Sequence, residues 1–166
     1  MDPCAPGPGE SVIFYGMRRL LFVLHGATSV VLIGAATHHA LQMRHYLRGR
    51  FERAALERTY ARVVAVAYVL TFALGAALYP TYRVHVRGLY LDRYAPGFAE
   101  LFDVKETYAS LTLVIAVALG ALAGTRWQAE APGLARVYAV MSFIVCAVVW
   151  FNAIAGMLVA SVRGVG

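Results

Sequence analysis

Three histidines lie in the first long apolar run of the sequence: His25, His38 and His39. An imidazole can ligate haem iron, hold a proton or donate a hydrogen bond, and ionisable side chains at membrane depth usually have a function. On a helix, His25 and His39 would fall within about 40° of each other and about 21 Å apart, whereas His38 would point nearly the opposite way. The spacing therefore predicts two sites on one face of one helix.

This spacing resembles that of membrane b-type cytochromes, in which histidines 13 or 14 apart on one helix hold two haems stacked across the membrane. The resemblance implies haem b, with His25 and His39 as candidate iron ligands and His38 as a further cofactor-binding candidate. In that family each iron also takes a histidine from a second helix, but the other three apolar runs contain none. The second ligand would come from the same helix of a second copy or from a methionine such as Met141 or Met157, or the haem would be five-coordinate. The alternative is structural histidines that hydrogen-bond to neighbouring helices.

Polar residues also flank the segment that joins the second and third apolar runs. The candidates are Tyr82, Arg83, His85, Asp103, Lys105 and Glu106. If the two runs pack together, these residues form a charged cluster at the membrane boundary. A histidine or tyrosine there can donate to a quinone carbonyl while an acid takes up or releases protons. The alternative is a salt-bridge network that fixes the connecting loop.

Four apolar runs must position these side chains, at about residues 18–43, 60–79, 107–124 and 134–161. A helix of roughly 20 apolar residues crosses about 30 Å of hydrocarbon. The chain is 60% hydrophobic and 14% charged, against about 45–50% and 25% in soluble domains. We therefore expect an all-α polytopic membrane protein, with residues 1–166 forming a single four-transmembrane-helix bundle. The runs are continuous rather than alternating, which argues against a β-barrel.

The connections predict an up-down-up-down path. Pro80 should end the second helix because proline lacks a backbone donor, and an outer loop 80–106 containing a short interfacial helix should follow. Small residues at Gly120 and Gly124 favour close helix packing, either within the bundle or between copies. Asn152, inside the fourth run, should hydrogen-bond across a helix interface.

The net charge of +6 reflects arginines, six of which lie between positions 44 and 62. Short loops rich in arginine face the cytoplasm and contact lipid headgroups. We therefore expect no nucleic-acid partner, a cytoplasmic loop 44–59, and both termini outside. The preference for arginine and alanine suggests a bacterial protein, in the inner membrane.

The sequence has no Walker loop, GxSxG, CxxC or HExxH motif. It places no acid in the middle of an apolar run, so the histidines are the only titratable groups expected at depth, which disfavours a transporter. Two hypotheses remain. The protein is a small membrane subunit in electron transfer that binds haem b, a quinone or both, or it is a non-catalytic structural or assembly subunit. Its partners would be the lipid bilayer and either a second copy or a larger membrane complex.

Overall fold

The computed structural model describes residues 13–50, 54–123 and 132–164, and this part of the chain is helical without strands. In chain order the elements are η1 (Tyr15–Met17), α1 (Arg18–Tyr46), α2 (Ala54–Thr81), η2 (Tyr82–Leu91), α3 (Asp92–Tyr94), α4 (Pro96–Leu122) and α5 (Pro132–Val162). Four helical segments are long and apolar enough to cross a membrane, which confirms the predicted all-α fold with four long apolar helices. Most of the predicted connection 125–134 lies outside the described residues.

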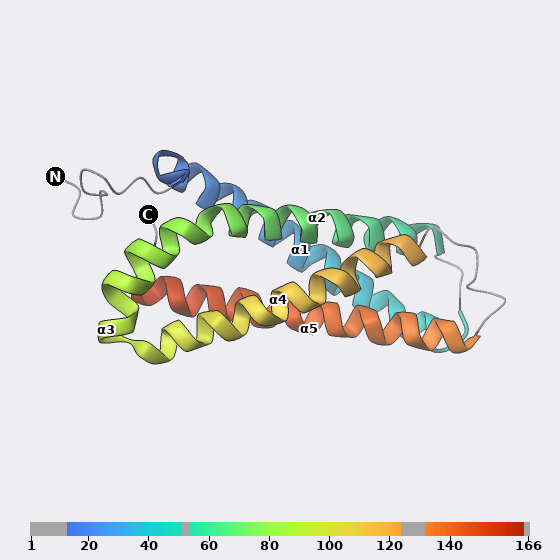
Figure 1. The fold of residues 1–166 in the computed structure, drawn as a ribbon. Helices are drawn as coiled ribbons and strands as arrows, with labels where there is room; N and C mark the ends of the chain where they lie inside the picture. Colours follow the sequence, from blue (N-terminus) through green and yellow to red (C-terminus); the bar gives the residue numbers. More distant parts are fainter. Residues whose placement is uncertain (1–12, 51–53, 124–131, 165–166) are drawn as a thin grey trace.

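The four long helices run side by side, alternating in direction (Figure 1). α1 packs against α2 and α5, and α4 packs against the same two helices. α3 lies at one end of the bundle together with the start of α1 and the end of α5, and we call this the α3 end. The other end, where α1 finishes and α2 begins, is the α1–α2 end. His25 therefore lies toward the α3 end and His39 toward the α1–α2 end.

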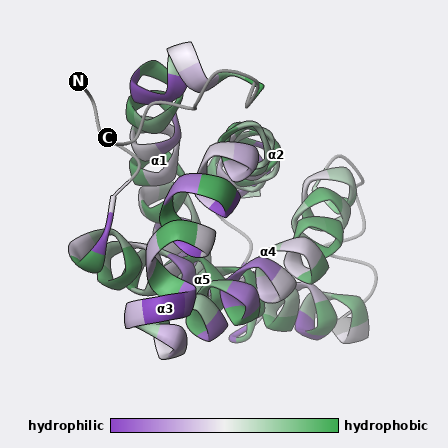
Figure 2. Ribbon diagram, turned by 60° about the vertical axis from the view of Figure 1, so that its left-hand side comes forward, coloured by the Kyte–Doolittle hydropathy of each residue, from purple (hydrophilic) through white to green (hydrophobic). Residues whose placement is uncertain are grey.

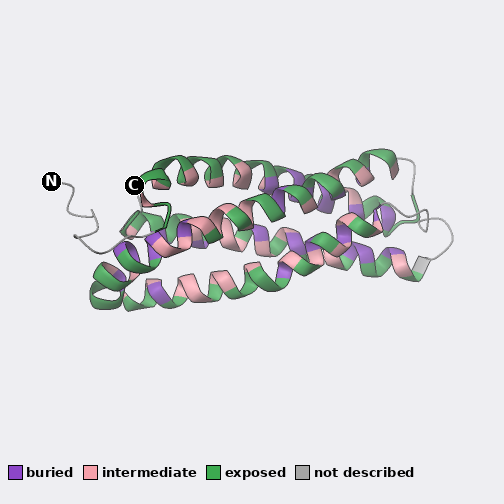
Figure 3. Cartoon of the chain, turned by 45° about the horizontal axis from the view of Figure 1, so that its top comes forward, coloured by how far each residue is buried: buried purple, intermediate pink, exposed green. Residues whose placement is uncertain are grey.

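Large apolar side chains cover the outside of the bundle, and small ones fill much of its interior. Val30, Leu111 and Met157 are between 64% and 70% exposed, whereas Ala61 and Ala116 are fully buried. Exposed residues line the outward faces of the helices (Figure 3). Hydrophobic residues extend along the helices, and α3 carries hydrophilic ones (Figure 2). Helices that pack through small residues and present large apolar ones outward suit a hydrocarbon surrounding.

The segment after Pro80 corrects the predicted outer loop. α2 continues through Pro80 into the π-helical segment η2, and Ala95 is the one position between 80 and 106 outside a helix. Pro80 removes one backbone hydrogen bond, and the wider π-helical turns that begin two residues later provide a different bonding pattern. The chain reverses at Ala95, and Pro96 opens α4, where its missing donor is not needed. The residues between 80 and 106, apart from Ala95, are thus held on helices.

Gly120 brings α4 close to α2. A Cβ atom added at Gly120 would lie 2.5 Å from the Cβ of Ala65 and 3.6 Å from the carbonyl oxygen of Ala61. The first distance is shorter than van der Waals contact allows, so this position requires glycine. Gly120 therefore serves packing within the bundle.

Gly120→Ala is expected to destabilise the bundle by about 1–3 kcal/mol, since overpacking forces helices apart. Gly34→Ala is the matched control, because no atom lies within 4 Å of the Cβ it would add to α1. That control should be neutral or slightly stabilising, given the higher helix propensity of alanine. Thermal unfolding of both variants in one detergent measures the difference. Equal midpoints would show that α2 and α4 are not in close contact at Gly120.

Candidate functional site

Five polar side chains lie buried together near the α1–α2 end, and we call them the Glu57 cluster. Its members are His39 and Tyr46 of α1, Glu57 of α2, and Tyr138 and Ser142 of α5. None is more than 4% exposed. The Nδ1 atom of His39 lies 2.7 Å from Ser142 Oγ, and its Nε2 atom lies 3.0 Å from Glu57 Oε1. Tyr46 donates to Glu57 Oε2 at 3.1 Å, and Tyr138 donates to Oε1.

Helical periodicity explains why Glu57 is buried. Residues 57, 61, 64 and 68 lie on one face of α2, and the other three are the buried Ala61, Val64 and Tyr68. An acid is therefore buried in the bundle beside His39, which we did not expect from the sequence. Glu57 falls within the predicted loop 44–59, but α1 continues to Tyr46 and α2 begins at Ala54. Its place on an apolar stripe of α2 was a signal available in the sequence.

The Glu57 cluster does not fit haem ligation by His39. A histidine binds iron through a ring nitrogen with a free lone pair. Both nitrogens of His39 already have hydrogen-bond partners, Ser142 and Glu57. His38 lies on the exposed surface, where its ring stacks on Tyr60 with centroids 5.4 Å apart. The geometry therefore does not provide the ligand at position 39 that two stacked haems would need.

His25 is held differently. Its ring lies between α1 and α2, with Nδ1 3.0 Å from the carbonyl oxygen of Thr71. A carbonyl only accepts hydrogen bonds, so Nδ1 carries the proton and Nε2 keeps its lone pair. A Cβ atom at Gly75 would lie 3.2 Å from His25 Cε1, so the glycine makes room for this ring. His25 can therefore act as a single ligand or acceptor.

Lys105, the one lysine in the sequence, lies inward from the α3 end. Its Nζ atom is 4.7 Å from the centre of the Phe102 ring, and its Cε atom would lie 3.6 Å from a Cβ at Gly156 of α5. In the described part of the chain no salt bridge joins Lys105 to an acid. A partly buried ammonium without a counter-ion favours an anion or a polarised oxygen beside it.

Tyr82 and His85, both on η2, are 6% exposed and have polar atoms without protein partners. The Tyr82 ring stacks on Phe102 with centroids 3.7 Å apart, and the His85 ring lies 4.9 Å from that of Tyr15. The Tyr82 hydroxyl and both ring nitrogens of His85 have no hydrogen-bond partner among the described residues. A buried polar group left in this way is destabilising by about 1–3 kcal/mol.

Asn152 and Thr71 add two more unpartnered oxygens to this half of the bundle. Asn152 does not bond across a helix interface as expected, because its Nδ2 donates to the Val148 carbonyl of its own helix and its Oδ1 has no partner. The Thr71 hydroxyl also lacks one. Of the six buried side-chain atoms without a partner among the described residues, five lie toward the α3 end and one, Gln42 Oε1, lies near the Glu57 cluster, which is itself internally paired.

The predicted charged rim forms only in part. Asp103 is paired by Arg87, with two hydrogen bonds of 2.5 and 2.9 Å, and Arg87 also approaches Asp92 at 3.5 Å. Arg83, which we had predicted for the rim, is exposed, and Glu106 is half-buried. The structure therefore brings Tyr82 and Lys105 together around Phe102 and leaves Arg83 outside. Arg87 was not predicted, and one turn of η2 separates it from Arg83.

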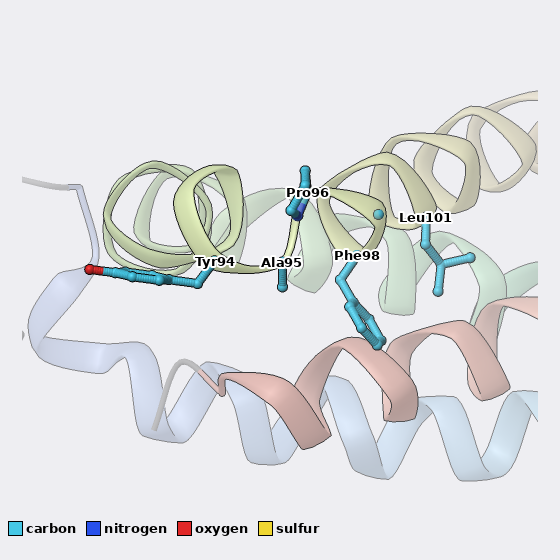
Figure 4. Close-up of a pocket in the computed structure, with 6 residues that line it drawn as sticks. Tyr94, Ala95, Pro96, Phe98 and Leu101 are labelled. Atoms are coloured by element: carbon cyan, nitrogen blue, oxygen red, sulfur yellow. The ribbon is translucent and has the colours of Figure 1, made fainter.

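An open pocket of ≈520 Å³ lies beside this group at the start of α4. Its lining residues are Tyr94, Ala95, Pro96, Gly97, Phe98 and Leu101. Phe98 and Leu101 point from α4 toward the ribbon of α5 (Figure 4). Both residues pack against the apolar cluster that contains Tyr82. An apolar surface therefore adjoins the unpartnered polar groups.

Among the described residues, no three histidine, cysteine, aspartate or glutamate side chains gather to hold a metal ion. What distinguishes the two polar regions is pairing. The Glu57 cluster satisfies its own hydrogen bonds, whereas at the α3 end several buried donors and acceptors have no hydrogen-bond partner among the described residues. Comparison of the chain with protein-family models, curated proteins and solved structures found no match, so function is argued from these two regions.

Proposed function

We propose that the protein is a multi-pass membrane subunit that binds a quinone at the α3 end, within an electron-transfer system. One observation carries the proposal: Tyr82 and Lys105 meet at Phe102 without hydrogen-bond or ion-pair partners among the described residues, and the buried His85 lies three residues further along η2. A quinone has a flat ring with two carbonyl oxygens that accept hydrogen bonds. Donors beside an aromatic surface are the arrangement that such a headgroup needs.

Each side chain has a role in this proposal. Lys105 donates to one carbonyl oxygen and stabilises the negative charge that develops there on reduction. Tyr82 and His85 supply donors on the η2 side. Glu106, half-buried next to Lys105 in sequence, exchanges protons with water. The apolar pocket at Phe98 offers a surface on which the tail of the quinone leaves the bundle.

The membrane location belongs to the same proposal. The four apolar helices would span a bacterial inner membrane, with residues 44–59 on the cytoplasmic side because of their arginines and the α3 end outside. In this orientation the quinone site lies at the outer boundary of the membrane. Single cysteines at Arg48 and Arg93, both exposed, should label from opposite sides in intact cells. Labelling of both from one side would contradict the orientation.

Haem b is a second candidate ligand, favoured by the free lone pair of His25. Because α2, α4 and α5 contain no histidine, a haem with two histidine ligands at His25 would take the second from another copy of the chain. Purified protein would then show a Soret band that His25→Ala removes and His39→Ala leaves at its position. A colourless, folded protein would exclude haem without affecting the quinone proposal.

Lys105→Met is expected to weaken binding of a short-chain ubiquinone by about ten- to one-hundredfold, since it removes a charged hydrogen bond but keeps the side chain's length. The measurement is a quinone titration of the protein in lipid nanodiscs. Arg93→Met, which removes an exposed cation from α3, is the matched control and should bind as the wild type does. Equal affinities of the two variants, or no binding by the wild type, would favour the structural or assembly subunit instead.

A further inference from the structure

The hydrogen bonds of the Glu57 cluster can be assigned proton by proton. As a carboxylate, Glu57 accepts from Tyr46, from Tyr138 and from the Nε2–H group of His39. These three donors satisfy both carboxylate oxygens. The one position left open is Nδ1 of His39, which faces the Ser142 hydroxyl at 2.7 Å.

A serine hydroxyl can either donate or accept, so this contact allows two protonation states. If Nδ1 has no proton, Ser142 donates to it, and the cluster has one negative charge. If Nδ1 carries a proton, the Ser142 oxygen accepts a hydrogen bond from Nδ1–H, and the cluster is neutral. That neutral form is either an imidazolium beside a carboxylate or an imidazole beside a carboxylic acid. All these forms use the same heavy-atom positions, and only the hydroxyl turns.

Burial favours the neutral form. Glu57 is fully buried and His39 is 1% exposed, and an unbalanced charge in such surroundings is strongly disfavoured. The charged and titratable groups facing the cluster are His39 and Tyr46 from α1, Glu57 and Arg58 from α2, and Tyr138 from α5. Arg58 donates to the Ala54 carbonyl and acts on the cluster only at a distance. The charged residues of α4, at positions 100, 103, 105 and 106, lie toward the other end of the bundle.

We propose that His39 and Glu57 together bind one exchangeable proton inside the bundle at neutral pH. On release, the Nδ1–H bond breaks, either directly or after the proton has passed from Glu57 to Nε2, and a water at the α1–α2 end takes the proton. No electron moves, and the five side chains stay in place. The site is thus a proton store in the membrane domain. The inference does not depend on quinone binding.

The test is nitrogen-15 NMR of the full chain, labelled at histidine and held in lipid bilayers without quinone. The His39 signals are identified by their loss in His39→Gln. At about pH 7 we expect Nδ1 of His39 to carry a proton, and we expect that proton to be lost as the pH is raised. An Nδ1 without a proton at neutral pH overturns the proposal, as does a single protonation state throughout the pH range in which the protein stays folded.

Ser142→Ala provides an independent check. If the proton-bound form is the imidazolium, it loses a charge-assisted hydrogen bond, which is roughly twice as strong as the neutral bond lost by the deprotonated form. His39 should therefore release its proton about one pH unit lower. Ser161→Ala is the control on the same helix, because its hydroxyl bonds only to the Leu158 carbonyl near the helix end, and it should leave the titration unchanged. Identical titrations in both variants would contradict an imidazolium that donates from Nδ1 to Ser142.

Discussion

Glu57→Ala is expected to lower the free energy of unfolding by about 3–5 kcal/mol, the range found when one partner of a buried ion pair is removed. Glu57 accepts hydrogen bonds from three side chains on two other helices, α1 and α5. Its removal leaves His39, Tyr46 and Tyr138 without their shared acceptor, although none of the three side chains is more than 4% exposed. The cavity left by the side chain adds to the loss.

Unfolding of the purified protein in one detergent measures this effect, with Glu100→Ala as the matched control. Glu100 is an exposed acid on α4, and its replacement should change stability by no more than about 0.5 kcal/mol. The stability lost in Tyr138→Phe should be smaller than in Glu57→Ala and larger than in Glu100→Ala, because this substitution removes one hydrogen-bond donor and keeps the ring. If Glu57→Ala and Glu100→Ala unfold alike, Glu57 is not held in a buried hydrogen-bonded cluster.

A double replacement separates stability from proton binding. His39→Leu combined with Glu57→Met removes both charges and fills the space with apolar groups, and such exchanges of whole buried pairs are often neutral. We expect it to recover a large part of the stability lost in Glu57→Ala. Full recovery would mean that the polar cluster is not needed for folding, which is consistent with a role in holding a proton.

The long helices were predictable because a run of about 20 apolar residues is a strong signal for a long apolar helix. The close contact at Gly120 was also predictable, since small residues mark helix interfaces. The path of the chain after Pro80 was not predictable from the sequence. The rule that proline ends a helix assumes α-helical bonding, and whether the chain instead widens into η2 depends on packing of Tyr82 and Val86 against α4 and α5.

The polar regions were predictable only in outline. His25, His39 and Lys105 were identifiable by residue type, but their partners depend on how the helices are rotated about their axes. Tyr138 and Ser142 carried no signal of their own, because tyrosine and serine are common in membrane helices and only the register of α5 against α1 brings them to His39.

His85→Phe is expected to stabilise the protein, whereas Glu57→Ala destabilises it. In the absence of quinone it should raise the free energy of unfolding by about 1–3 kcal/mol. The substitution removes two buried nitrogens that have no partner among the described residues and keeps an aromatic ring against Tyr15. His38→Phe is the control, since His38 also contacts a tyrosine ring but is exposed. It should change stability by no more than about 0.5 kcal/mol.

Repeating the measurement with a saturating short-chain ubiquinone tests the proposed site. A ligand stabilises a protein in proportion to the logarithm of its concentration over its dissociation constant. If His85 binds the headgroup, quinone stabilises the wild type more than it stabilises His85→Phe. The higher free energy of unfolding that His85→Phe shows without quinone then becomes smaller or is reversed. If His85→Phe is destabilising even without quinone, the imidazole has a structural partner and the headgroup site is wrongly placed. A residue that destabilises the protein without quinone and stabilises it with quinone bound belongs to a binding site and not to a structural contact.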